Sequence, residues 1–392
     1  MKSIASVASL VIAGLCISLA ALAQDNVRLA LPETVFALPG LECNLYFDNV
    51  VLVLDADEYT FDVNCPKGIQ LAECWRYVPG AEEVGEYALT LTVRNGENAV
   101  VAQGNTTIRV APPNAGAGKE VSVLLIGDSL TNASVYSQHL LDLCGANGSP
   151  KLTLIGSHGK DDPLGPNRHE GYGGWTAKRF ATHWTGIART GDYKERGSPF
   201  LYETEEGERV LDLQRYCDDV NGGVLPDFVT IFLGCNDTFG ADEASIERQI
   251  DDMFVHMDAL IAMIHAASPD IPIGLIQPVP PAVSQDAFGA NYGTGQTRWQ
   301  YRRNQHRVVE RMAEHYAAMP EVSLVPAYVN LDCEHNFPSG AQAVNARNEE
   351  DIIRQNNGVH PAETGYRQIG DSVCCWLMNQ LAAMAQPEET VP

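Results

Sequence analysis

Positive charge is scarce in this sequence. Its 26 lysine and arginine residues stand against 50 aspartate and glutamate residues, so the formal net charge is −24 at pH 7. A field of this sign repels nucleic acid and anionic membrane surfaces, and we expect neither as a partner. Cysteine and histidine spacings typical of zinc sites are also missing, so we expect no metal ion.

Long hydrophobic runs are missing beyond the N-terminus. Residues 1–23 carry one charge, at Lys2, then an apolar run over residues 10–15 and the segment Ala21-Leu22-Ala23. This pattern predicts a secretory signal peptide cleaved near Ala23, and hence a secreted or periplasmic protein; the alternative is an N-terminal anchor helix. No later segment is long enough to cross a bilayer, so we expect no membrane insertion after cleavage.

Cysteine occurs ten times, and Cys16 lies in the predicted signal peptide, so nine cysteines remain after cleavage. The expected compartment permits disulfides. Because nine is odd, at least one thiol is free or bonded to another molecule. Cys43, Cys65 and Cys74 lie close enough in sequence for one bridge, whereas the adjacent pair Cys374-Cys375 is typical of core filling.

Two regions of different periodicity follow the signal peptide. Residues 24–111 alternate in polarity like strands, most clearly over residues 87–93, and Asn95-Gly96 predicts a type I′ hairpin turn. We expect a small, immunoglobulin-like β-sandwich in this region. Its acidic residues Asp55, Asp57 and Glu58 are interpreted as a solvated turn rather than a calcium site. Residues 112–118, with two prolines and two glycines, predict a linker.

The second region, residues 119–386, alternates between short strand patterns and longer helical ones, and residues 387–392 form a tail. A helical stripe of apolar residues covers residues 246–264, and another helix fits residues 299–319. Strands separated by helices predict parallel pairing in an α/β sandwich. Five runs are apolar enough to be strands buried on both faces: residues 121–126, 152–155, 228–233, 273–276 and 322–325.

Three polar motifs lie where chemistry is expected. In an open parallel sheet, ligands bind beyond the carboxyl ends of the strands. Each motif also has an ordinary structural interpretation: a helix N-cap for its serine, a turn for its asparagine and a surface position for its histidine. The motifs are Gly127-Asp128-Ser129-Leu130 after the first strand, Gly234-Cys235-Asn236-Asp237 after the third, and Asn357-Gly358-Val359-His360 before a C-terminal helix.

Together, and in this order, the motifs resemble the SGNH/GDSL hydrolase superfamily, from about Val121 to Leu381. The resemblance implies a three-layer, flavodoxin-like parallel sheet and a serine esterase that needs no organic cofactor. It implies that Ser129 is the nucleophile and His360 the general base. It also implies an oxyanion hole made by the backbone N–H groups of Ser129 and Gly174 and the amide of Asn236.

One position departs from the family pattern. Three residues before its catalytic histidine the family usually has aspartate, where this sequence has Asn357. An asparagine can accept the Nδ1–H bond of the histidine, but it lacks the charge that stabilises an imidazolium ion. Three hypotheses follow: Asn357 orients His360, another group such as Asp332, Glu334 or a backbone carbonyl does so, or the enzyme is impaired.

Two long segments, residues 157–225 and 277–303, interrupt the α/β pattern and are expected to wall the cleft. They mix aromatic, polar and glycine residues, which suits a sugar ring. Trp175, Tyr292, Arg298 and Trp299 are candidate substrate contacts, with core packing and ion pairing as the alternative roles. We expect an esterase that removes O-acyl groups, mainly O-acetyl, from a carbohydrate. The alternatives are a short-chain lipid or aryl esterase and a non-catalytic glycan-binding protein on the same scaffold.

Overall fold

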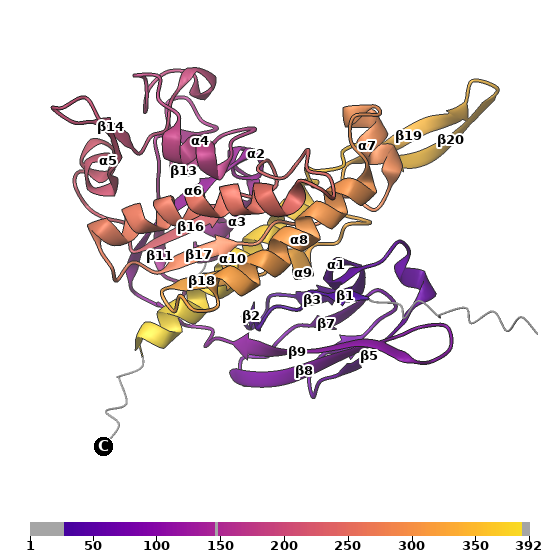
Figure 1. The fold of residues 1–392 in the computed structure, drawn as a ribbon. Coiled ribbons are helices and arrows are strands. Elements are labelled where there is room, and N and C mark those ends of the chain that lie inside the picture. Colours follow the sequence, from indigo (N-terminus) through magenta and orange to yellow (C-terminus); the bar gives the residue numbers. More distant parts are fainter. Residues whose placement is uncertain (1–26, 146–147, 386–392) are drawn as a thin grey trace, which may run out of the picture.

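The computed structural model describes residues 27–145 and 148–385 (Figure 1). The predicted signal peptide, residues 1–23, and the tail, residues 387–392, lie outside the described residues. No helix within the described ranges is long and apolar enough to cross a membrane.

The first part of the chain is built from strands. A four-stranded sheet has the order β2-β9-β8-β5, a three-stranded sheet has the order β3-β7-β6, and β1 pairs with β4. The strands are β1 (Arg28–Leu29), β2 (Thr34–Ala37), β3 (Cys43–Tyr46), β4 (Val51–Leu52), β5 (Thr60–Asn64), β6 (Ile69–Gln70), β7 (Cys74–Tyr77), β8 (Gly85–Arg94) and β9 (Val100–Val110), with the short helices α1 (Phe47–Val50) and η1 (Ala56–Glu58) between them.

Alternation of side chains joins the two sheets through one core. Leu89, Leu91 and Val93 on β8 are buried, as the period of two predicts, and they share a cluster with Leu45 on β3 and Trp75 on β7. Because buried residues of both sheets share one cluster, the structure supports the predicted β-sandwich. The short helices α1 and η1 were not predicted.

The predicted hairpin is present, but its turn differs from the prediction. Residues 95–99 separate β8 from β9, so the loop is wider than a two-residue type I′ turn. The positive φ of 61° belongs to Asn98, not to Asn95 or Gly96. The Oδ1 atom of Asn95 accepts the backbone N–H groups of Glu97 and Ala99, and this asparagine turn sets the loop.

The second part contains a mixed sheet of seven strands. On one edge, β10 pairs in parallel with β11 along its first half and with β13 at its end. On its other edge, β10 pairs in parallel with β16, and β17 and β18 continue the sheet in parallel. The short strand β12 pairs antiparallel with β13. The strands are β10 (Glu120–Gly127), β11 (Lys151–Ile155), β12 (His158–Gly159), β13 (Arg168–Gly171), β16 (Phe228–Phe232), β17 (Ile273–Ile276) and β18 (Val322–Val325). All five predicted strands are therefore confirmed, in the order β11-β10-β16-β17-β18.

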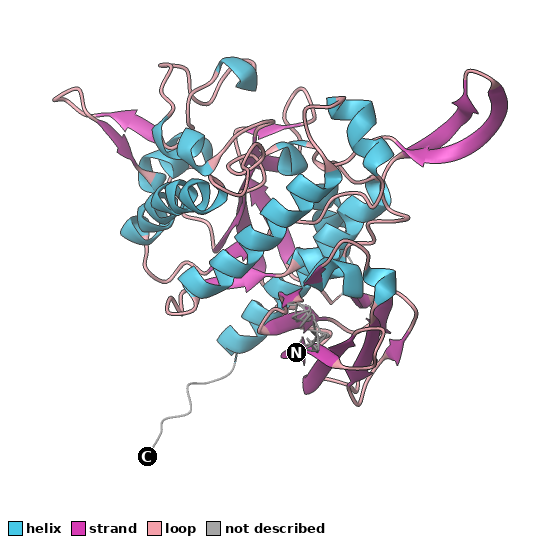
Figure 2. Cartoon of the chain, turned by 45° about the vertical axis from the view of Figure 1, so that its right-hand side comes forward, coloured by secondary structure: helices cyan, strands magenta, loops and turns pink. Residues whose placement is uncertain are grey.

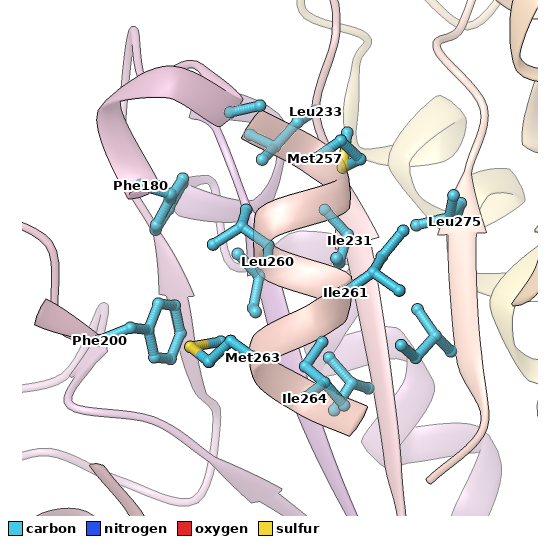
Figure 3. Packing of buried hydrophobic residues seen from close by; sticks show 14 of the residues in the cluster. Phe180, Phe200, Ile231, Leu233, Met257, Leu260, Ile261, Met263, Ile264 and Leu275 are labelled. Atoms are coloured by element: carbon cyan, nitrogen blue, oxygen red, sulfur yellow. The ribbon is translucent and has the colours of Figure 1, made fainter. Parts of the chain in front are cut away.

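Helices cover both faces of this sheet and complete three layers. One face packs against α4 (Ala177–Thr182), α5 (Leu213–Val220), α6 (Ile246–Ala267) and α8 (Arg298–Tyr316), and the other against α3 (Val135–Cys144) and α10 (Glu363–Ala385). Figure 3 shows the α6 contact, where Met257, Leu260 and Ile261 lie over strand residues Ile231 and Leu275. The helical spacing of three and four residues in the sequence places this stripe against the sheet.

The remaining elements are short or lie at the rim. They are α2 (Ser129–Asn132), α7 (Gln285–Tyr292), α9 (Ala327–Asn330), η2 (Tyr193–Glu195), the hairpin β14 (Leu201–Glu203) and β15 (Arg209–Leu211), and the hairpin β19 (Ser339–Asn345) and β20 (Asn348–Gln355). The β19–β20 hairpin is largely exposed and projects from the body beside α7 (Figure 2). Its second strand leads directly into the segment that ends at His360.

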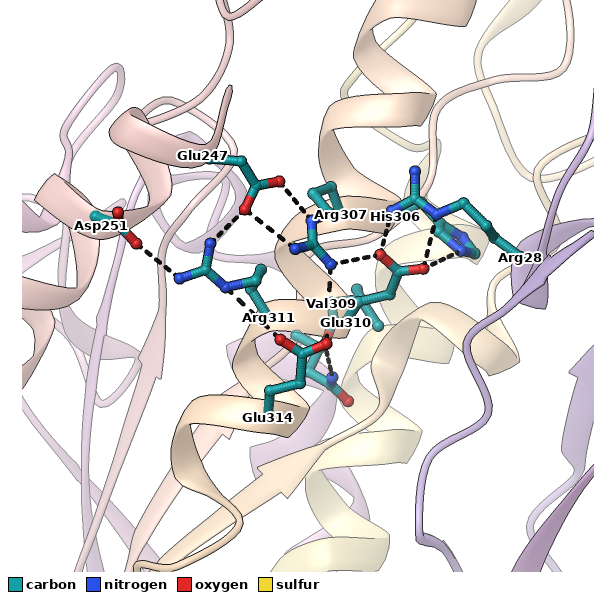
Figure 4. Close-up of polar contacts among 10 residues, drawn as sticks. Arg28, Glu247, Asp251, His306, Arg307, Val309, Glu310, Arg311 and Glu314 are labelled. Atoms are coloured by element: carbon teal, nitrogen blue, oxygen red, sulfur yellow. Dashed lines mark hydrogen bonds and ion pairs between the residues drawn. The ribbon is translucent and has the colours of Figure 1, made fainter. Parts of the chain in front are cut away.

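The segment between β9 and β10, which contains the predicted linker of residues 112–118, packs against the second part of the chain. Residues 113–118 form consecutive turns, and Ala111 and Ala115 are buried in the core cluster of α3 and α10. Polar contacts also hold the β-sandwich against α8 and α9. Figure 4 shows Arg28 paired with Glu310 of α8, which also contacts Arg307. Asn44 likewise bonds Asn330 of α9.

The cysteines are thiols throughout the described part of the chain. Cys43, Cys65 and Cys74 are unbonded, so the bridge that their spacing allowed is not formed. Cys374 and Cys375 are buried within α10, which agrees with their interpretation as core filling.

Candidate active site

Ser129 is the first residue of α2, directly after the end of β10. Asp128 is the N-cap of this helix, because its Oδ1 accepts the N–H of Leu130 at 2.9 Å. The capping role considered for Ser129 therefore belongs to Asp128, and the Ser129 hydroxyl remains available. Gly127 permits the tight approach between strand and helix: a Cβ there would lie 2.0 Å from Oγ1 of Thr131.

His360 lies opposite this serine, at the end of the segment that follows β20. Its Nε2 is 2.8 Å from Oγ of Ser129, although the two residues are 231 positions apart. The segment passes close over Phe288, since a Cβ on Gly358 would come within 2.7 Å of that ring. Burial lowers the pKa of the His360 imidazole below its ordinary value of 6.5, so the ring is neutral at pH 7.

Asn357 does not orient the imidazole ring in the predicted way. Its Oδ1 accepts the backbone N–H groups of Val359 at 3.1 Å and His360 at 2.9 Å, so it holds the main chain instead. Asp332 and Glu334 do not take over: Asp332 binds His335 and Tyr46. Among residues 27–145 and 148–385, no hydrogen bond to Nδ1 of His360 is found, and the serine and histidine form a dyad.

Gly174 lies in the loop between β13 and α4. Its φ is +75°, which favours glycine, and a Cβ there would meet no atom within 4 Å. The strand before the loop pairs with the end of β10, and the N–H of Tyr172 binds the carbonyl of Gly127 at 3.0 Å. Within the described ranges, no partner is found for the N–H groups of Ser129 and Gly174. Both are free to donate to a ligand.

Asn236 follows β16 and lies beside Asp128. Its Nδ2 donates to Oδ2 of Asp128 at 3.2 Å and to the carbonyl of Trp175 at 3.1 Å. Burial raises the pKa of Asp128 to about 6, while hydrogen bonds from Cys235 and from the N–H of Leu130 act in the opposite direction. Both amide hydrogens of Asn236 are thus engaged, so donation to an oxyanion requires one of these long bonds to be exchanged.

Three of the four candidate substrate contacts are corrected. The side chain of Trp175 is 1% exposed and packs among Tyr172 and Phe180, so its ring offers no face to a ligand. Arg298 pairs with Asp48 of α1 at 3.3 Å, in the contact between the β-sandwich and α8. Trp299 lines a separate surface cavity with Val27, Leu52, Val53, Leu54, Glu58 and Tyr59.

Tyr292 is the candidate that packs against segments of the site. It packs, half-buried, against a small cluster that contains Cys235, next to Asn236, and Val359, next to His360. Phe239 joins the same cluster, with its ring centroid 5.2 Å from that of Tyr292. Sequence reasoning missed Phe239, although it lies three positions beyond Asn236 in the same post-strand segment. We call Phe239 and Tyr292 the aromatic shelf.

The comparisons with known proteins agree with this architecture. A family model described as GDSL-like lipase/acylhydrolase matches residues 125–368, which is more than half of the chain. The chain belongs to the GDSL-like lipase/acylhydrolase family. This confirms the resemblance in the sequence motifs and makes the protein an SGNH/GDSL ester hydrolase.

Solved structures with similarity to this GDSL-like hydrolase include a family 3 carbohydrate esterase of Clostridium thermocellum, with 16% identity and a TM-score of 0.40 over 68% of this chain and 100% of that chain. A family 3 carbohydrate esterase of Talaromyces cellulolyticus has 15% identity and a TM-score of 0.36 over 68% and 100%. A possible lipase from Chitinophaga pinensis has 16% identity and a TM-score of 0.36 over 67% and 99%. No curated protein matches the chain.

Proposed function

We propose that this GDSL-like hydrolase removes O-acyl groups, mainly O-acetyl, from carbohydrates by acyl transfer through Ser129 and His360. The observation that carries the proposal is the 2.8 Å contact between Oγ of Ser129 and Nε2 of His360, beside the unpartnered N–H groups of Ser129 and Gly174. A hydroxyl, a base and free donors within one site are the groups that ester hydrolysis requires.

In the proposed reaction, the Ser129 oxygen attacks the ester carbonyl while His360 takes the hydroxyl proton. The N–H groups of Ser129 and Gly174 and the amide of Asn236 hold the oxyanion. The C–O bond of the ester then breaks, and His360 returns the proton to the leaving alcohol. Water repeats the sequence on the acyl-enzyme, with His360 again as base, which releases the carboxylic acid and restores the serine.

Replacing Asn357 by aspartate tests whether Ser129 and His360 act without a charged third residue. The carboxylate retains the two bonds from the N–H groups of Val359 and His360, and it adds a negative charge near the imidazole. We expect kcat to rise by about tenfold and the acid limb of kcat/KM, which lies below pH 6.5 in the wild type, to move to higher pH. The pH profile of both proteins on an activated acetate ester measures this. An unchanged kcat and an unchanged pH profile of kcat/KM would contradict this expectation.

The aromatic shelf supports a sugar as the group that carries the ester. Half-buried rings that pack against the sequence neighbours of Asn236 and His360 offer an apolar face to the C–H side of a sugar ring. We expect Tyr292→Ala to raise KM for an acetylated oligosaccharide by about tenfold, with kcat little changed, because stacking is lost in ground state and transition state alike. Tyr292→Phe is the matched control, since it keeps the ring. Equal effects of the two substitutions would argue against stacking.

Acetate release from a panel of acetylated glycans tests the proposed function directly, with Ser129→Ala as the inactive control. We expect release from at least one glycan at a kcat/KM above that for acetate esters of simple alcohols. Preference for short-chain lipid or aryl esters over every glycan would favour the alternative substrate class. Glycan binding without any ester cleavage by the wild-type protein would contradict the proposed reaction.

A further inference from the structure

The loop that carries Gly174 depends on its ends for its position. Residues 172–176 connect β13 to α4, and the side of Gly174 where a Cβ would lie has no atom within 4 Å. At its start, the N–H of Tyr172 binds the carbonyl of Gly127, as described above. The N–H of Trp175 closes a turn onto the carbonyl of Tyr172 at 3.1 Å. The end of the loop needs a separate anchor.

Two consecutive residues after β16 supply that anchor. Asn236 donates to the carbonyl of Trp175, and Oδ1 of Asp237 accepts the N–H of Ala177 at 3.0 Å. These contacts lie on either side of Thr176, one and three positions beyond Gly174. The other carboxyl oxygen of Asp237 is buried, and no partner for it is found among the described residues. The bond from Ala177 is therefore the contact by which this carboxyl holds the loop.

We propose that Asp237 is a positioning residue for the oxyanion hole: through the N–H of Ala177 it fixes the loop that presents the N–H of Gly174. This rests on the proposed function, because it assigns Gly174 as a donor to the oxyanion. Oxyanion donors act only when they are preorganised, so a loop that shifts by a fraction of an ångström loses transition-state binding before it loses substrate binding.

Burial makes the Asp237 carboxyl a weaker acid, so its neutral and its charged forms are both present near pH 7. Burial raises the pKa of Asp237 to about 7, the bond from Ala177 lowers it in part, and the nearby Asp128 raises it again. No cation is among the groups that shift it. The bond to Ala177 needs an acceptor oxygen at this place, so an asparagine amide, which has the same shape and the same acceptor, should perform the role.

Steady-state kinetics of Asp237→Ala and Asp237→Asn test the proposal on an acetate ester. For Asp237→Ala we expect kcat to fall by about 30-fold, KM to change by less than about threefold, and the affinity for a boronic acid that forms a tetrahedral adduct on Ser129 to fall by the same factor as kcat. For Asp237→Asn we expect kcat and boronic acid affinity within about threefold of the wild type.

Asp212→Ala is the matched control. Asp212 is the N-cap of α5, where its Oδ1 accepts the N–H of Arg215 at 2.9 Å, so this variant removes the same kind of bond away from the site. It should lower Tm but leave kcat unchanged. The proposal is overturned if Asp237→Ala keeps wild-type kcat, if its KM rises as much as kcat falls, or if Asp237→Asn is as slow as Asp237→Ala. Activity that survives Ser129→Ala would instead refute the proposed function.

Discussion

Ser129→Ala should lower kcat for ester hydrolysis by roughly 10⁵-fold while the fold stays intact. The substitution removes the attacking oxygen, and the one side-chain hydrogen bond found for Nε2 of His360 within the described residues is to Ser129. Alanine is smaller than serine and is a good helix former at the start of α2, so Tm should stay within a few degrees of the wild type.

The pattern of double substitution makes this result specific. A nucleophile and its base act as a unit, so Ser129→Ala combined with His360→Ala should be no slower than Ser129→Ala alone. Ser245→Ala is the control: its hydroxyl binds Oδ1 of Asp242 at the start of α6, away from the dyad, and kcat should not change. Residual activity above about 1% in Ser129→Ala would assign the nucleophile elsewhere.

The sheet could be predicted from the sequence because its central strands β10, β16 and β17 are largely buried on both faces, whereas β11 and β18 are only partly buried. Such strands need continuous apolar runs, and the five runs match the observed strands within one or two residues at each end. Ser129, Asn236 and His360 could be predicted as neighbours for a related reason. They lie just beyond strand ends or before a helix, and parallel strands bring their carboxyl ends to one edge.

The errors arise where a side chain's partner is distant in sequence or is the main chain. Arg298 pairs with Asp48, which is 250 positions away. The sequence around either residue gives no sign of this contact. Trp175 lies in a segment without clear periodicity, so its burial could not be predicted from the sequence. Asn357 has the right spacing to reach the imidazole, but the same oxygen also suits a turn, and the backbone N–H groups take it.

The packing of residues 112–118 could not be predicted for a physical reason of the same kind. Proline, glycine and alanine in residues 112–118 are typical of flexible connections, yet alanine is small enough to be buried wherever a core approaches. Ala115 does so against α10. Composition alone indicates how flexible a segment is when it makes no contacts. Here the segment does make contacts, with the regions on either side of it.

Asn236→Ala should have the second large effect. We expect this substitution to slow turnover by roughly 10²- to 10³-fold, which is the range for removing one oxyanion donor. The resting structure makes the test informative, because the amide of Asn236 also holds the carbonyl of Trp175 and the carboxyl of Asp128. If its only role were to hold the loop, Asn236→Ala would resemble Asp237→Ala in size. A direct donor should cost more.

The affinity for a boronic acid inhibitor tests whether the loss in Asn236→Ala is a loss of oxyanion binding. A tetrahedral boronic acid adduct on Ser129 needs the oxyanion donors, so its affinity should fall by the same factor as kcat in Asn236→Ala. KM for the ester should change little, because the ground-state carbonyl gains less from the amide than the developing oxyanion does. A loss below about fivefold in kcat would mean that the amide neither donates to the oxyanion nor is needed to position the loop, and that the two backbone N–H groups stabilise the oxyanion without it.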